Sequence, residues 1–169
     1  MIEKDQVLSS SQKSYLFNEF DRFLQTSETG KLKILGKDRL ATRLNTRHSG
    51  LLLSNEDLIA GKNVLDLASH DGRWSFAALK VGAKHVTGIE HKPRLIRKTT
   101  ANFEHYAVDT DSYQFIQGDI FEHIPKVTQR IDTVFCFGIF YHISHHMHLL
   151  SQIDSLGVRG LILDTEIVK

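Results

Sequence analysis

The sequence predicts an α/β protein built on an open parallel sheet, with helices on both faces and a helical extension before the sheet. Three observations lead to this class. Residues 63–90 have the pattern of a strand, a tight turn, a helix and a second strand. Helical periodicity returns over about 93–106. Apolar runs at 113–117, 134–137 and 160–168 then supply three further strands.

A single βαβ unit is predicted over residues 63–90, with the sequence NVLDLASHDGRWSFAALKVGAKHVTGIE. A short apolar strand leads into the turn at 68–72, and apolar residues at helical spacing follow from Arg73 until Gly82 ends the helix. The second strand ends on the acidic Glu90. Because the ends of two strands joined by a right-handed crossover are neighbours, a carboxylate here can accept the ribose hydroxyls of a nucleoside.

The turn itself distinguishes between nucleotide ligands. The dinucleotide fingerprint needs three glycines to bring the backbone close to a pyrophosphate, whereas residues 68–72, Ala-Ser-His-Asp-Gly, keep one. This composition counts against a dehydrogenase. Asp66 and Asp71 suit a nucleoside ligand that carries an ammonium group and no phosphate, and S-adenosylmethionine fits that description.

The run VLDLASHDG resembles the first motif of class I S-adenosylmethionine-dependent methyltransferases, which have a Rossmann-like fold. It departs from the usual motif at Ala68 and His70, where glycine is usual, and keeps Gly72. The resemblance implies the strand order 3-2-1-4-5 and S-adenosyl-L-methionine as cofactor. It also implies that Asp119, after the third strand, accepts a hydrogen bond from the adenine amino group, although the same residue suits a helix N-cap. The expected cofactor-binding residues are Asp66, Ala68, Ser69, His70, Gly72, Glu90, His91, Asp119, Ile120, Phe137 and Gly138.

A second informative run is IDTVFCFGIFYHI at residues 131–143. Together with the run LILDTEIV, it resembles the enzymes of methyltransferase fold that modify the wobble uridine of tRNA. The resemblance places Tyr141 and His142 where methyl donor and acceptor meet, so we expect them to be the catalytic pair. We predict no metal site, because the neighbouring histidines have no nearby Cys, Asp or Glu to complete one.

The first fifty residues are predicted to form a helical extension and loop, with the cofactor-binding domain at residues 51–169. Residues 1–11 are polar and expected to fray, and Tyr15, Leu16, Phe20, Phe23 and Leu24 mark one face of an amphipathic helix. The stretch 31–49 is the most basic of the chain, and its cations suit a solvated face, a phosphate-bearing substrate or RNA. We predict a polar loop at 45–50, in which Arg47 and His48 are candidate substrate contacts.

The predicted sheet lacks the antiparallel hairpin that usually follows the fifth strand of methyltransferases. That strand, predicted over 160–168, is then an exposed apolar edge. Either the sequence is a truncated form, or a second copy of the chain or another partner completes the sheet.

Composition sets outer limits on function. The chain has 169 residues, 41% hydrophobic and 24% charged, with a formal net charge of +1, as expected of one folded domain. Its single cysteine, Cys136, lies in an apolar strand and is expected to be buried and inert. We find no leader and no apolar run long enough to cross a membrane, and so predict a cytoplasmic protein.

These observations predict an S-adenosylmethionine-dependent methyltransferase whose acceptor is a small molecule. One alternative is an enzyme that modifies the wobble uridine of tRNA, which needs a basic surface beyond the cofactor cleft. Another is a cofactor-binding subunit without catalytic activity, which would bind the cofactor without turnover.

Overall fold

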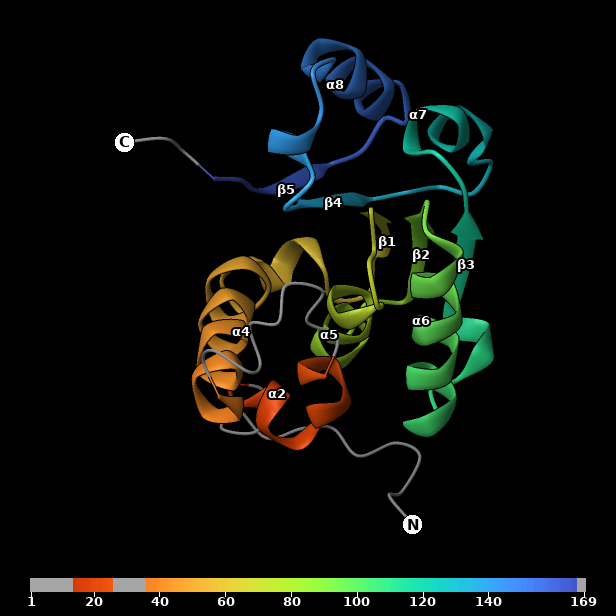
Figure 1. Ribbon diagram of the computed structural model, residues 1–169. Coiled ribbons are helices and arrows are strands. Elements are labelled where there is room, and N and C mark those ends of the chain that lie inside the picture. Colours follow the sequence, from red (N-terminus) through yellow and green to blue (C-terminus); the bar gives the residue numbers. More distant parts are fainter. Residues whose placement is uncertain (1–13, 26–35, 167–169) are drawn as a thin grey trace.

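The computed structural model describes residues 14–25 and 36–166 (Figure 1). Five parallel strands form one sheet in the order β3-β2-β1-β4-β5, which confirms the predicted Rossmann-like fold. The strands are β1 Asn63–Leu67, β2 His85–Glu90, β3 Tyr113–Gln117, β4 Thr133–Phe137 and β5 Gly160–Asp164. Since all five run in one direction, their carboxyl ends share one edge of the sheet.

Helices cover both faces of the sheet (Figure 1). Strand residues alternate between two cores: Val64 and Phe135 join the core beneath α2, α4, α5 and α6, whereas Leu65 and Cys136 join the core beneath α7 and α8. The thiol of Cys136 is buried, as predicted. The helices are α2 Leu16–Glu19, η1 Asp21–Leu24, α4 Lys37–Leu51, η2 Leu53–Leu58, α5 Arg73–Val81, α6 Pro93–His105, η3 Thr110–Ser112, α7 Ile120–His123, η4 Ile124–Lys126, η5 Phe140–His142 and α8 His146–Ser155.

The first described helix differs from its prediction. It breaks at Phe20, whose backbone leaves the helical region with φ −100° and ψ 61°, so α2 and η1 are separate turns. Tyr15, predicted on the inner face, is 61% exposed. The break turns Phe20 and Phe23 toward Phe76, with ring centroids 4.7 and 5.1 Å away, so aromatic packing decides the path of the chain here.

The predicted polar loop at 45–50 is wrong, because these residues are the last turns of α4. Leu40, Leu44 and His48 recur at helical spacing and are all buried, so they supply an inner face that the polar neighbours obscure in the sequence. This inner face joins the core beneath α5, and α4 continues to Leu51, past the predicted domain boundary. Residues 1–11, together with Lys31 and Lys33 of the basic stretch, lie outside the described residues.

Strand β5 ends at Asp164, four residues before its predicted end at 168, and residues 167–169 are not described. Leu161 and Leu163 remain 37% and 41% exposed, and within the described residues β5 pairs with β4 alone. A second chain at this edge stays a prediction. No helix in the ranges 14–25 and 36–166 has the length and hydropathy needed to cross a bilayer.

Asn45 joins α4 to α2, and its replacement by alanine should destabilise the protein. Its Oδ1 accepts from the buried Phe17 N–H at 2.9 Å, and its Nδ2 donates to Asn18 Oδ1 at 2.7 Å. Asn45→Ala leaves the Phe17 N–H unpaired, so we expect the free energy of unfolding in urea to fall by about 1–3 kcal/mol. Thr46→Ala, an exposed neighbour on α4, is the control. Equal stabilities for the two variants would contradict the role of Asn45.

Candidate functional site

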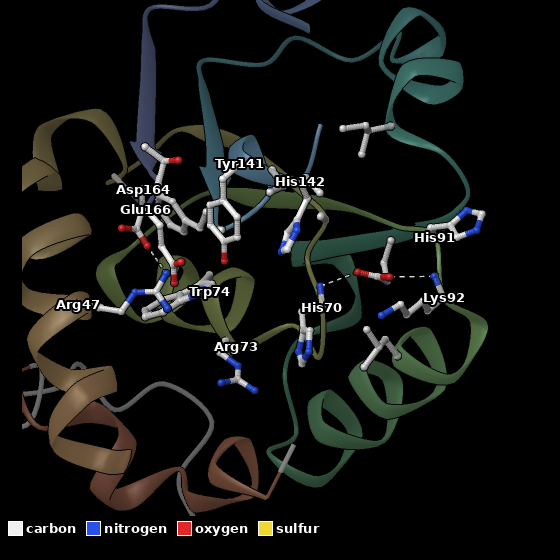
Figure 2. A pocket seen from close by; sticks show the side chains of 18 of the residues that line it. Arg47, His70, Arg73, Trp74, His91, Lys92, Tyr141, His142, Asp164 and Glu166 are labelled. Carbon is white, nitrogen blue, oxygen red and sulfur yellow. Dashed lines mark hydrogen bonds and ion pairs between the residues drawn. The ribbon is translucent and has the colours of Figure 1, made fainter. Parts of the chain in front are cut away.

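A cavity of about 690 Å³ opens at the carboxyl edge of the sheet (Figure 2). Its lining comes from the segments that follow all five strands and from the inner side of α4. Ligands of open α/β sheets bind at this edge, and the volume lies in the range of small-molecule and cofactor sites.

The turn between β1 and α5 adopts a backbone that normally requires glycine. Ala68, His70 and Gly72 have φ of 55°, 57° and 78°, in the left-handed region. These are the positions at which the methyltransferase motif usually has glycine. Ala68 and His70 thus adopt, with larger side chains, a backbone conformation that favours glycine.

Glu90 closes the turn from the neighbouring strand. It is 6% exposed, and its Oε2 accepts from the His70 N–H at 3.0 Å while Oε1 accepts from the Lys92 N–H at 2.8 Å (Figure 2). Two backbone donors thus fix the carboxylate in the cavity wall. Because a carboxylate has about four acceptor positions, it still has capacity for hydroxyl groups of a ligand.

Asp66 and Asp71 correct an expectation, since neither lines the cavity. Both are buried, and their carboxylates bind partners within the protein. Asp71 accepts two hydrogen bonds from Arg73, at 2.7 and 2.8 Å, and Asp66 accepts one from Ser75 Oγ at 2.6 Å. Neither carboxylate is placed to contact an ammonium group in the cavity directly.

The two acids have opposite pKa shifts. Burial raises the pKa of Asp66 to about 7. Burial acts in the same sense on Asp71, but the Arg73 guanidinium and the His70 ring, 3.3 Å from its Oδ1, hold the pKa of that carboxyl well below its usual range. Asp71 is therefore the charged anchor of the turn, whereas burial favours the protonated form of Asp66.

Three further predicted residues lie outside the cavity. Ser69 is buried, with its Oγ close to Gly88 on β2, and Gly72 is packed against Thr99. His48, predicted as a substrate contact, is 1% exposed, and its ring packs edge-on against Phe17. Because the segment is a helix rather than a loop, His48 turns into the core while Arg47 reaches the cavity.

The remaining predicted cofactor residues line the cavity together: Ala68, His70, Glu90, His91, Asp119, Ile120, Phe137 and Gly138. Asp119 also caps α7, since its Oδ1 accepts from the Phe121 N–H at 2.8 Å. The side chain thus has the N-cap function that the sequence allowed, and it still faces the cavity.

Tyr141 and His142 lie on η5, at the mouth of the same cavity (Figure 2). Both side chains are exposed, and their rings lie 4.3 Å apart between centroids. Gly138 has φ 72° and its missing Cβ would lie 3.6 Å from the Tyr141 hydroxyl, so the chain turns sharply after β4 and brings η5 back over the cavity.

Sequence reasoning missed several lining residues, chiefly Trp74, Asp164 and Glu166. Arg47 forms an ion pair with Asp164, and its guanidinium carbon lies 5.0 Å from the centre of the Trp74 ring, which forms one wall (Figure 2). A signal for Asp164 existed: it ends an apolar strand just as Glu90 does. Trp74 belongs to the apolar residues at helical spacing after Arg73, and that spacing predicts a core residue rather than a cavity wall.

The turn offers no run of glycines to a pyrophosphate. The anchored Glu90 lies at the end of β2, where a carboxylate can accept hydrogen bonds from the hydroxyls of a nucleoside sugar. The turn separates the domain from dinucleotide oxidoreductases, in which an acid at the end of β2 can accept the same ribose hydroxyls. Together with the strand order, the turn points to the class of S-adenosylmethionine-dependent methyltransferases. The family model described as "Methyltransferase domain" matches residues 58–165. The chain belongs to this methyltransferase domain family.

Relatives with assigned names include two that act on RNA. A tRNA U34 carboxymethyltransferase from Nautilia profundicola is 29% identical over 113 residues, which cover 66% of this chain and 36% of the relative. A ribosomal RNA large subunit methyltransferase K/L from Shewanella loihica is 34% identical over 113 residues, 66% of this chain and 16% of the relative. Among solved structures, the bifunctional kinase-methyltransferase WbdD has a TM-score of 0.52 at 26% identity, covering 68% of this chain and 26% of WbdD. The chain thus spans about a third or less of the length of these proteins, at 36%, 16% and 26%.

Ala68→Gly should raise the free energy of unfolding. The left-handed backbone costs a residue with a Cβ about 1–2 kcal/mol, and glycine relieves this strain. Glycine also makes the unfolded chain more flexible, which offsets part of the gain. We expect a net gain of about 0.5–1 kcal/mol in urea denaturation. Ala107→Gly, at φ 48° after α6 and outside the cavity lining, is the matched control and should gain as much. A loss of stability at position 68 alone would show that the Ala68 methyl makes essential contacts.

Asp66→Asn should change how stability depends on pH. The folded chain holds the Asp66 proton until about pH 7, whereas the unfolded chain releases it at the ordinary, lower carboxyl pKa. Between these values the folded state binds more protons, so the Asp66 contribution to the free energy of unfolding falls as pH rises. The asparagine variant should therefore gain stability over the parent between pH 4 and 7. Urea titrations across this range measure the difference, and a constant difference would contradict the shift.

Proposed function

We propose that this domain transfers a methyl group from S-adenosylmethionine to a nucleotide of an RNA acceptor, with tRNA as the first candidate. One observation carries the proposal: a single cavity holds the anchored Glu90 at one end and the exposed Tyr141 and His142 at its mouth. A base that protrudes from an RNA can reach such a mouth. The named relatives that act on RNA support this acceptor and give no support to the small molecule that the sequence favoured.

The cavity fits the proposed cofactor. The Glu90 carboxylate, held by two N–H groups, is oriented to accept hydroxyl hydrogen bonds, and Leu95 and Ile120 offer apolar surface for an adenine ring. Asp119 lies beside Ile120 with one carboxylate oxygen bound to the α7 cap. S-adenosylmethionine supplies an electrophilic methyl group on its sulfonium when bound. A strong base is then not required, and the protein must mainly align the acceptor and exclude water.

Tyr141 and His142 are proposed to orient the acceptor. A phenol hydroxyl and an imidazole both donate and accept hydrogen bonds, so together they can fix the plane of a base. An imidazole can also take up the proton that a nitrogen or oxygen acceptor loses on methylation. Arg47 lies on the other side of the mouth, where its ion pair with Asp164 and its stacking on Trp74 limit its motion. A tRNA acceptor would also agree with the predicted cytoplasmic location.

Glu90→Ala should weaken S-adenosylmethionine binding by at least about 1 kcal/mol, roughly fivefold in Kd, because the hydrogen bonds to the ligand are lost. Calorimetric titration measures the change. Glu104→Ala removes an exposed acid from the outside of α6 and is the matched control, with unchanged affinity expected. A thermal melt of each variant shows whether the fold persists. An unchanged Kd in a folded Glu90 variant would remove this residue from the cofactor site.

Methyl transfer itself is tested with S-adenosylmethionine labelled in the methyl group and tRNA prepared without base modifications. We expect label in the tRNA, and digestion to nucleosides identifies the modified base. Tight binding of S-adenosylmethionine without transfer to tRNA would overturn the proposed reaction and favour the cofactor-binding subunit without catalytic activity.

A further inference from the structure

A second, smaller cavity of about 280 Å³ lies at the opposite, amino-terminal edge of the sheet. Four cations line it, each from a different connection that leads into a strand: Lys62 before β1, Lys84 before β2, Arg130 before β4 and Arg159 before β5. Asp132 is the acid in the lining. We call this site the basic basin. None of these side chains belongs to the cavity that the proposed function uses.

The connections that form the basic basin are fastened to one another by backbone hydrogen bonds. The Lys84 N–H donates to the Lys62 carbonyl at 2.9 Å, the Asp132 N–H donates to the Asn63 carbonyl at 2.9 Å, and the Arg159 N–H donates to the Asp132 carbonyl at 2.8 Å. The four cations thus lie on loops whose backbones are hydrogen-bonded to one another. Because these backbones are already ordered, binding of an anion there costs little further conformational entropy.

The charge of the basic basin is largely uncompensated. The Asp132 carboxylate is occupied, since Oδ2 accepts from the Asn63 N–H and Oδ1 accepts from Arg130, each at 3.1 Å. Within residues 14–25 and 36–166, Lys62, Lys84 and Arg159 make no ion pair with an acidic side chain. Lys62, Lys84 and Arg159 therefore converge on a polar hollow whose lining has one acid, Asp132, already hydrogen-bonded to Asn63 and Arg130, so cations outnumber the anion.

We propose that the basic basin binds a phosphate group. Lysine supplies point charges and arginine a planar set of N–H donors, and together they match the tetrahedral oxygens of a phosphate. The basic basin is separated from the cavity at the carboxyl edge of the sheet by the length of the strands, about 17 Å for five residues. Its ligand therefore does not compete with the cofactor. The phosphate can come from a free phosphoanion or from the backbone of an RNA. The site itself does not depend on the acceptor proposed above.

The test compares the parent chain with the double variant Lys84→Ala/Arg159→Ala. The control, Arg39→Ala/Arg97→Ala, removes the same two charges from exposed positions on α4 and α6, outside the basin. Each protein is titrated with pyrophosphate by calorimetry at low ionic strength, and with tRNA over a range of salt concentrations. Affinity for S-adenosylmethionine, measured alongside, should be equal in all three and shows that the fold is intact.

A loss of pyrophosphate affinity of at least tenfold in the basin variant, with the control unchanged, supports the site and assigns it to free phosphoanions. If the ligand is the RNA backbone, the parent chain should bind tRNA but not pyrophosphate. In that case the basin variant, and not the control, should bind tRNA more weakly. Its log affinity should fall less steeply with log salt concentration, with a slope smaller by about 2 for two lost phosphate contacts. The proposal is overturned if both variants behave alike with both ligands, or if the parent binds neither. Failure of methyl transfer to tRNA leaves the pyrophosphate result intact, so the two proposals fail separately.

Discussion

The site depends on one hydrogen bond, from the His70 N–H to the Glu90 carboxylate. It joins the turn after β1 to the end of β2, two segments that are neighbours only because a right-handed crossover brings parallel strands together. The Ser69 N–H, which donates to the Ile89 carbonyl at 3.0 Å, joins the same two segments, so the turn and the carboxylate are positioned together. The second N–H donor, from Lys92, binds the other oxygen, so two backbone groups orient the carboxylate.

A left-handed backbone at Ala68 and His70 persists because its surroundings leave it no alternative. Helix α6 holds the turn from the side, where Thr99 Oγ1 donates to the His70 carbonyl at 3.1 Å and Asn102 Nδ2 donates to the Asp71 carbonyl at 3.2 Å. Buried Asp71 adds its pair with Arg73. The conformational preference of glycine has been replaced by contacts from another element, which explains how the motif tolerates two larger residues.

The sheet was predictable because its strands are short and mostly apolar, four of the five end at or just before an acid or a glycine, and the resemblance supplied their order. The turn sequence showed where the cavity would open. The direction of side chains was not predictable: the polar residues at 45–50 hide a helix that buries His48, and Asp66 and Asp71 bind within the protein. Such choices depend on partners distant in sequence, as Phe17 is for Asn45. Pattern and spacing do not specify those partners.

The ion pair between Arg47 and Asp164 joins α4 to β5, segments 117 positions apart. During synthesis the chain emerges from its amino terminus, so α4, the turn and Glu90 all leave the ribosome well before β5 does. The wall that contains Asp164 is therefore absent until the fifth strand has docked beside β4. The mouth therefore acquires its final shape only when β5 is in place. Binding of the cofactor would then favour the completed fold over its partly folded precursors.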